Sequence, residues 1–234
     1  MKVCGRAYLQ VLLLLFPIAV SAQWQKKPYN QWSEKEALNV LNNSPWGQTQ
    51  TVTDTSTMFG ARAARTGPTG EYEVPKTNFR IRFFSAKPIR QAISRLVEIK
   101  QKGEMNKQLE GQLKALAAAD FPDYIVITVL TDFAESGTRM GTAATLLDKL
   151  TSAELKNTTY LSIGGQRLFL QEYQPPRKDG LGARFVFPRM VDGKPFISLD
   201  SGEVLFHSEL TGAKIDLNMR FKVNDMVFDG KLEY

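Results

Sequence analysis

The stretch from Tyr124 to Thr131, which reads YIVITVLT, decides the fold. Apart from its two threonines, every residue in it is apolar or aromatic, and most of them are β-branched. Such a run, without polar alternation, is typical of a strand that is covered on both faces. We therefore expect residues 124–131 to form the central strand of a sheet.

Two amphipathic helices are expected before this strand. Apolar residues recur at i, i+3, i+4, i+7 and i+8 from Ile89, which is the pattern of one buried helical face. Pro88 suits the first turn of this helix, because its missing amide costs little there, and the helix should end near Gly103. A second helix is expected over residues 104–119. The pair should form a helical hairpin that packs on the sheet beside a strand at residues 79–85.

Shorter elements are expected near the N-terminus. Ser33 and Glu36 have the spacing of a capping box, which predicts a helix that begins after Ser33 and stops by Asn43. Threonine at every second position over residues 48–59 predicts a strand with all of these threonines on one face. The glycines and prolines of residues 60–75 predict a surface loop.

A third helix is expected over residues 142–155, and strand patterns follow it. The strands are separated by turn signals, which are Gly164-Gly165, Asp192-Gly193 and Asn224-Asp225. The sequence therefore predicts an α+β fold, in which N-terminal helices pack on a mixed sheet that continues into a C-terminal antiparallel β-meander. We expect a single domain, helix-rich over 23–155 and strand-rich over 156–234. Residues 175–182 are either a domain boundary or a long hairpin loop.

The first residues predict a secretory signal peptide. Lys2 and Arg6 precede an apolar run at residues 11–20, and Val20-Ser21-Ala22 supplies the small residues of a cleavage site after Ala22. The alternative is a membrane anchor, but a spanning helix needs roughly 20 apolar residues, and Pro17 interrupts this shorter run. No later stretch is long and apolar enough to span a bilayer.

Removal of residues 1–22 takes away Cys4, the only cysteine, so the mature chain has no disulfide. The remaining 212 residues are enough for a core of ordinary size without one. Export without cysteine indicates a bacterial protein of the periplasm or the extracellular medium. The net charge falls from +6 to +4 on cleavage, which weakly favours anionic partners such as lipid head groups or acidic polysaccharide.

Several chemistries are excluded or disfavoured by composition. His207 is the only histidine, so no cluster of histidine and cysteine can bind zinc, and a Ser-His-Asp triad would have to use His207. Gly164-Gly165 lies between strands and is not a phosphate-binding loop. We expect no cofactor, no metal and no nucleic acid as a partner.

Asp132 and Glu135 are the candidate catalytic residues. They follow the C-terminal end of the central strand, where ligands often bind in α/β sheets. Two carboxylates there could act as acid and base on a glycosidic bond. The alternative is a solvated loop in which Asp132 caps a turn.

Two groups of residues are candidates for binding. Arg80, Arg82 and Arg90 belong to a region from residue 80 to 102 with seven cations and one acid, which could hold phosphate or carboxylate groups. The alternative is the ordinary wet face of a helix and an edge strand. All tryptophans fall near the mature N-terminus, where they could stack on sugar rings or tie the terminus to the core; they are Trp24, Trp32 and Trp46.

The leading functional hypothesis is a non-enzymatic, exported bacterial protein. It would act as a binding or assembly module of the envelope, with an anionic envelope component or another envelope protein as its partner. The alternative hypothesis is a carboxylate-dependent hydrolase that acts on polysaccharide through Asp132 and Glu135.

Overall fold

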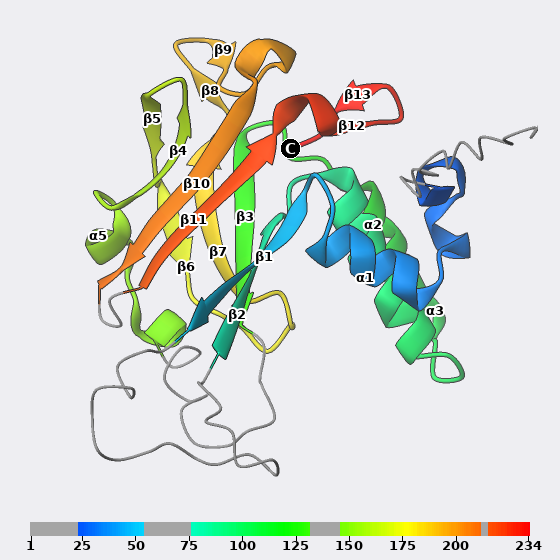
Figure 1. The fold of residues 1–234 in the computed structure, drawn as a ribbon. Coiled ribbons are helices and arrows are strands. Elements are labelled where there is room, and N and C mark those ends of the chain that lie inside the picture. The colour runs from blue at the N-terminus through cyan, green and yellow to red at the C-terminus, as the bar shows by residue number, and fades with distance from the viewer. Residues whose placement is uncertain (1–22, 54–75, 132–145, 212–214) are drawn as a thin grey trace, which may run out of the picture.

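The central strand β3 (Tyr124–Thr131) lies in the middle of a five-stranded sheet, as the sequence predicts. The computed structural model describes residues 23–53, 76–131, 146–211 and 215–234. The strand order is β1-β2-β3-β7-β6 (Figure 1). The other members are β1 (Gly47–Thr53), β2 (Lys76–Phe83), β6 (Glu172–Gln174) and β7 (Ala183–Pro188). Every described pairing in this sheet is antiparallel, which differs from the mixed sheet that we expected.

Strand β3 is covered on both faces. Ile125, Ile127 and Val129 are fully buried in the main core. On the opposite face, Val126 packs with Phe84 and Val186 in a second, smaller apolar cluster. Burial on both sides explains why the strand has no polar alternation.

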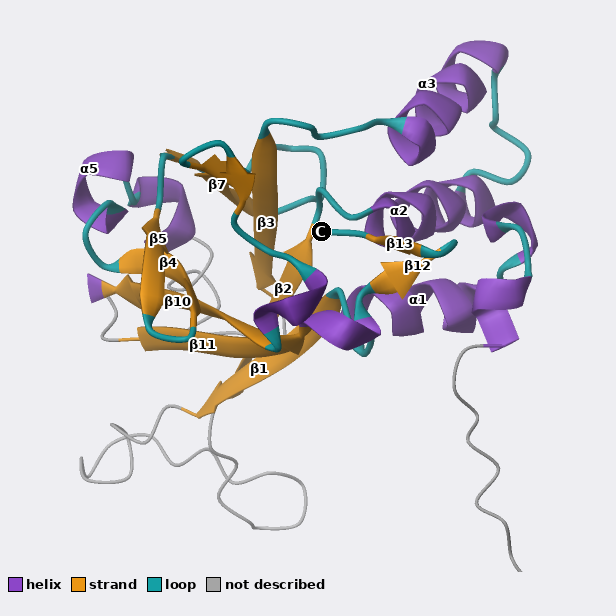
Figure 2. Cartoon of the chain, turned by 90° about the horizontal axis from the view of Figure 1, so that it is seen from above, coloured by secondary structure: helices purple, strands orange, loops and turns teal. Residues whose placement is uncertain are grey.

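Three helices lie on one side of β3, and the second sheet lies on the other (Figure 2). They are α1 (Glu34–Asn42), α2 (Lys87–Lys100) and α3 (Lys107–Ala118). The segments α2 and α3 form the expected hairpin between β2 and β3, and α2 also packs against α1. Helix α2 buries Ile89, Ala92 and Leu96 in the main core. Two 3-10 turns, η1 (Gln23–Lys26) and η2 (Tyr29–Gln31), precede α1.

The helix expected over residues 142–155 is divided in the described part. Residues 146–149 are helical, and a separate short helix, α5 (Ser152–Leu155), follows. The Thr151 hydroxyl accepts a hydrogen bond from the Glu154 amide, and the Glu154 side chain accepts one from the Thr151 amide. This capping box starts a new helix, because the residue at the N-cap has an extended backbone.

A second, four-stranded antiparallel sheet has the order β11-β10-β4-β5. Its strands are β4 (Thr159–Ile163), β5 (Gln166–Phe169), β10 (Glu203–Leu210) and β11 (Ile215–Lys222). The expected C-terminal meander is therefore divided, because β6 and β7 join the first sheet while β10 pairs with β4. Residues 175–182 connect β6 and β7, which pair with each other, so this segment is a hairpin loop.

All three predicted turns are confirmed, and two of them join the strands of a hairpin. Gly164-Gly165 joins β4 to β5, and Asp192-Gly193 joins β8 (Met190–Val191) to β9 (Lys194–Pro195). Asn224-Asp225 instead lies in a 3-10 turn, η6 (Val223–Asp225). The last hairpin pairs β12 (Val227–Phe228) with β13 (Lys231–Leu232) around Asp229-Gly230, and η4 (Leu199–Ser201) precedes β10.

Aromatic side chains fill the space between the two sheets. The rings of Phe83 and Phe221 meet edge to face with centroids 4.8 Å apart. Phe206 of the second sheet meets Phe185 and Phe187 of the first, at 5.4 and 6.4 Å. These contacts make one core from strands that are far apart in the sequence.

Side-chain amides bridge the two sheets where β1 lies beside β11. The Gln50 side chain donates to the Asp216 carbonyl and accepts from the Asn218 amide, both at 2.8 Å. The Gln48 side chain donates to the Arg220 carbonyl at 3.1 Å. Two glutamines of β1 thus occupy backbone groups along the outer edge of β11.

The N-terminus of α1 should make a pH-dependent contribution to stability. The pKa of Glu36 is lowered to about 2, first by its hydrogen bond with Lys27 and then by the Ser33 amide. A lowered pKa in the folded state stabilises the fold above the unfolded value, near 4.3, and the contribution is lost as the pH falls toward 2. Because Glu36 is near the surface, we expect the free energy of unfolding to fall by only about 1 kcal/mol over this pH range.

Unfolding in urea between pH 6 and pH 2 tests this expectation. Glu36→Gln should lower the free energy of unfolding by about 1 kcal/mol at pH 6. It should also make the free energy of unfolding change less between pH 6 and pH 2 than in wild type. Glu34→Gln is the matched control, since Glu34 lies in the same turn and its side chain makes no hydrogen bond with any described residue. An identical pH dependence in wild type and Glu36→Gln would contradict the assignment.

Candidate functional site

The three tryptophans are buried, so they cannot stack on a ligand as the binding hypothesis required. Trp24 is 7% exposed, and Trp32 and Trp46 are 0% exposed. The Trp32 indole donates to the carbonyls of Trp24 and Lys27, and the Trp46 indole donates to the Glu233 carbonyl. The alternative is therefore confirmed: these residues tie the N-terminal segment to the C-terminal hairpin.

Two of the three predicted binding arginines are also buried. Arg82 is 4% exposed and donates to the Leu41 carbonyl at 3.0 Å and the Asn42 side chain at 2.8 Å. Arg82 thus holds the C-terminal end of α1. Arg80 is half-buried on β2.

Arg90 is 2% exposed and bonds only to backbone oxygens of the described chain. It donates to the carbonyls of Phe84, Ser85 and Ala119. Burial lowers the pKa of Arg90 from its ordinary value. The exposed basic face that we expected from Arg82 and Arg90 does not form, because helix ends cover the strand and helix that carry them.

Asp132 and Glu135 lie outside the described residues. His207 bonds to the Asn218 side chain at 2.7 Å and the Glu209 carboxylate at 3.4 Å, and it bonds to none of the serines that the structure describes. Within the described ranges, no group of three or more histidine, cysteine or acidic residues could hold a metal ion.

The outer face of the second sheet, which points away from the core, carries a row of rings. Strand register places Phe169 opposite Tyr160, Tyr160 opposite His207, and His207 opposite Asn218. The ring centroids of Phe169 and Tyr160 are 5.8 Å apart, and those of Tyr160 and His207 are 4.7 Å apart. We call Phe169, Tyr160 and His207 the aromatic row.

Two of the three members of the aromatic row are half-buried, and Phe169 is 45% exposed. The hydrogen bond from His207 to Asn218 continues the row onto β11. Together with Asn218, the row crosses all four strands of the second sheet. This sheet lies on the side of the molecule away from α3 (Figure 2).

Polar and charged side chains lie beside the aromatic row. The strand pairing places four residues opposite one another in a neighbouring row, which are Arg167, Ser162, Leu205 and Arg220. The Arg167 guanidinium carbon lies 4.3 Å from the centre of the Tyr160 ring. Arg220 approaches the Glu203 carboxylate at 3.8 Å. The outer face therefore combines flat apolar rings with hydrogen-bonding groups.

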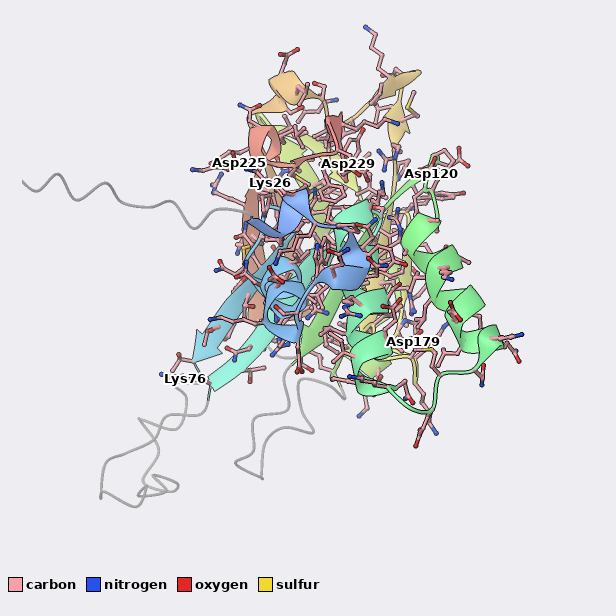
Figure 3. The ribbon with its side chains drawn as sticks, turned by 90° about the vertical axis from the view of Figure 1, so that its right-hand side faces the viewer. Lys26, Lys76, Asp120, Asp179, Asp225 and Asp229 are labelled. Carbon is pink, nitrogen blue, oxygen red and sulfur yellow. The ribbon has the colours of Figure 1, made fainter. Side chains whose placement is uncertain are left out.

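A polar groove meets the outer face at Glu203 and Arg220. It has a volume of about 620 Å³, and its walls come from the end of α1, from β1 and from the C-terminal strands. The lining residues are Asn42, Asn43, Ser44, Pro45, Gln48, Thr49, Glu203, Arg220, Lys222 and Asp225. A second groove of about 470 Å³ lies beside Lys26 and Asp229 (Figure 3).

The aromatic row was not found from the sequence, although one signal for it was present. A two-residue turn at Gly164-Gly165 fixes the register of β4 and β5, so that Tyr160 must stand opposite Phe169 and Ser162 opposite Arg167. The contribution of His207 could not be found in this way, because β10 is distant in the sequence.

Two further findings bear on function. No helix in the described part of the chain is long and apolar enough to cross a membrane. Comparison with protein-family models, with curated proteins and with solved structures finds no match.

Proposed function

We propose that the protein is an exported, non-enzymatic bacterial binding module, which binds polysaccharide through the outer face of its second sheet. The observation that carries the proposal is the aromatic row, with Arg167 placed over Tyr160. Export rests on the predicted signal peptide of residues 1–22. The partner would be a polysaccharide of the bacterial envelope or its surroundings.

A sugar suits this face better than a protein partner does. Sugar rings have apolar C–H faces that pack on aromatic rings, and hydroxyls that bond to arginine, serine and amide side chains. Phe169 is the only described residue of the outer face among the large exposed apolar side chains. Protein interfaces are usually built on larger contiguous apolar patches.

The polar groove supports the same interpretation. It continues the outer face beyond Arg220 with three asparagine and glutamine side chains, Asn42, Asn43 and Gln48. A polymer that crosses the four strands from Phe169 would reach this groove. The hydrolase hypothesis, through Asp132 and Glu135, stays a prediction from the sequence.

Affinity electrophoresis through gels that contain soluble polysaccharides tests the proposal. Tyr160→Ala and Phe169→Ala should each weaken retention about tenfold, which corresponds to the loss of one stacking contact. Tyr124→Ala is the matched control, because Tyr124 is 43% exposed but lies on the first sheet. Thermal unfolding of each variant verifies that the fold is kept.

The panel should include neutral and acidic chains, such as dextran, xylan, hyaluronate and polygalacturonate. Retention by at least one polymer that falls in Tyr160→Ala and Phe169→Ala, but not in Tyr124→Ala, supports the proposal. Failure of the wild type to be retained by any polymer would overturn it. Equal weakening by all three variants would overturn it as well.

A further inference from the structure

The most distinctive group on the outer face is Arg167. It is exposed on β5, and its guanidinium lies over the Tyr160 ring, with 4.3 Å between the guanidinium carbon and the ring centre. Contact with an aromatic face orients a guanidinium while leaving its N–H groups available in the plane. Arg167 is therefore held in place before any ligand arrives.

No carboxylate competes for Arg167 in the part of the chain that the structure describes. Three other arginines there do have one: Arg95 pairs with Glu98, Arg184 with Asp179, and Arg220 with Glu203. The residue directly opposite Arg167 is Ser162, whose hydroxyl can donate to the same anion. The fork of N–H donors on Arg167 is thus unused by described residues.

The acidic side chains of the outer face lie away from Arg167. Glu203 and Glu209 are both on β10, where they face Arg220 and His207. Strand β4 lies between β10 and β5, so that roughly 9–10 Å of sheet separates these acids from Arg167. The end of the face around Phe169 therefore has a positive charge that the rest of the face does not cancel.

The spacing on β5 suits a single acidic sugar. Arg167 and Phe169 are two residues apart on the same face of the strand, which is about 6.8 Å. A sugar ring packed on Phe169 would place a carboxylate on its rim near the Arg167 fork. Guanidinium and carboxylate groups pair with two parallel hydrogen bonds.

We infer that the ligand of the outer face is an acidic polysaccharide, whose carboxylates pair with Arg167. This inference rests on the proposed function and names the class of polysaccharide. Phe169 supplies the stacking surface, Tyr160 holds the Arg167 guanidinium in place, and Arg167 selects the charged chain over its neutral counterpart.

Polygalacturonate and its fully methyl-esterified form provide the test, because they share a backbone and differ in the carboxylate charge. Wild type should bind polygalacturonate at least tenfold more tightly than the ester. Arg167→Ala should bind polygalacturonate about tenfold more weakly than wild type, and its affinity for the ester should change little. Arg167→Lys should retain part of the affinity, because it keeps the charge and loses the fork.

Arg177→Ala is the matched control, since Arg177 is exposed in the loop after β6 and its replacement removes the same charge. If Arg177→Ala loses less than twofold in affinity for polygalacturonate, the larger loss in Arg167→Ala is due to pairing at Arg167. General attraction between a basic protein and an anionic polymer would affect both variants. Equal losses in the two variants would overturn the inference.

The failure of the inference can be distinguished from failure of the proposed function. Equal binding of both polymers, with loss of both in Tyr160→Ala and Phe169→Ala, would leave the polysaccharide module standing and overturn the role of Arg167. Absence of binding to both polymers would overturn the inference, and the wider panel of neutral and acidic chains would then decide the proposed function.

Discussion

Replacing Arg90 by methionine should lower the free energy of unfolding by about 3 kcal/mol, although Arg90 forms no ion pair with a described carboxylate. The side chain is 2% exposed and serves three backbone carbonyls, those of Phe84, Ser85 and Ala119. Methionine fills a similar volume but donates no hydrogen bond, so these oxygens lose their charged donor.

Two effects oppose each other in this substitution. Burial of an uncompensated charge is costly, as the lowered pKa of Arg90 reflects, and its removal relieves that cost. Each buried carbonyl left without a donor costs about 1–3 kcal/mol. Because the bonds to Phe84 and Ser85 are buried, water cannot easily replace the guanidinium there, and we expect the loss of donors to dominate.

Urea unfolding of Arg90→Met, Arg90→Lys and Arg177→Met measures the effect. Lysine should recover only part of the stability, since a single ammonium cannot reach all three carbonyls in a fork geometry. Arg177→Met, on an exposed loop, should change the stability by less than about 0.5 kcal/mol. If Arg90→Met and Arg177→Met have equal stability, the loss of the carbonyl contacts does not outweigh the relief of removing the buried charge, and the prediction is wrong.

Gly182→Ala should lower the free energy of unfolding by at least about 4 kcal/mol, or prevent folding, whereas Gly180→Ala should lower it by only about 1–2 kcal/mol. Both glycines have positive φ, +80° at Gly182 and +72° at Gly180, so both alanines meet the same backbone strain. A Cβ at Gly182 would lie 2.3 Å from the Val129 carbonyl oxygen, while a Cβ at Gly180 would meet no atom within 4 Å.

The clash at Gly182 cannot be relieved by a side-chain movement. Val129 belongs to β3, and its neighbour across the sheet is Ala183, the first residue of β7. The carbonyl is thus fixed in the middle of the sheet. The difference in stability between Gly182→Ala and Gly180→Ala, measured by thermal or urea unfolding, isolates this contact. Equal costs at the two positions would show that β7 can shift away from β3.

The elements that the sequence predicted correctly are those that depend on local patterns. The burial of β3 follows from its unbroken apolar run, and α1 begins where the capping box of Ser33 and Glu36 places it. The turn at Asp229-Gly230 has the same residues as the confirmed turn at Asp192-Gly193, and we overlooked it. In that case the signal was present in the sequence.

Other features depend on contacts between distant segments. Strand β10 pairs with β4, and β7 with β3, and neither partner is fixed by a short turn. The alternation of Phe79, Ile81 and Phe83 in the sequence indicates one buried face of β2, and all three side chains are fully buried. It could not show that the end of α1 also covers Arg82 on the opposite face.

In the candidate site, too, some features follow from local sequence patterns and others from contacts between distant segments. Pairing of Tyr160 with Phe169 could be deduced from the turn between them, but the addition of His207 and Asn218 required the order of the second sheet. Exposure was also misjudged for the tryptophans. Their place near the mature N-terminus suggested accessibility, whereas Trp32 and Trp46 are among the most buried side chains of the described chain.

The glutamines between β1 and β11 affect how this molecule meets other copies of itself. An unprotected strand at the border of a sheet is a template on which further chains can add and grow into fibres. Here the Asp216 carbonyl, the Asn218 amide and the Arg220 carbonyl are already occupied by Gln48 and Gln50. The chain thus discourages self-assembly at this border with two neutral side chains, without a proline or a lysine at the contact.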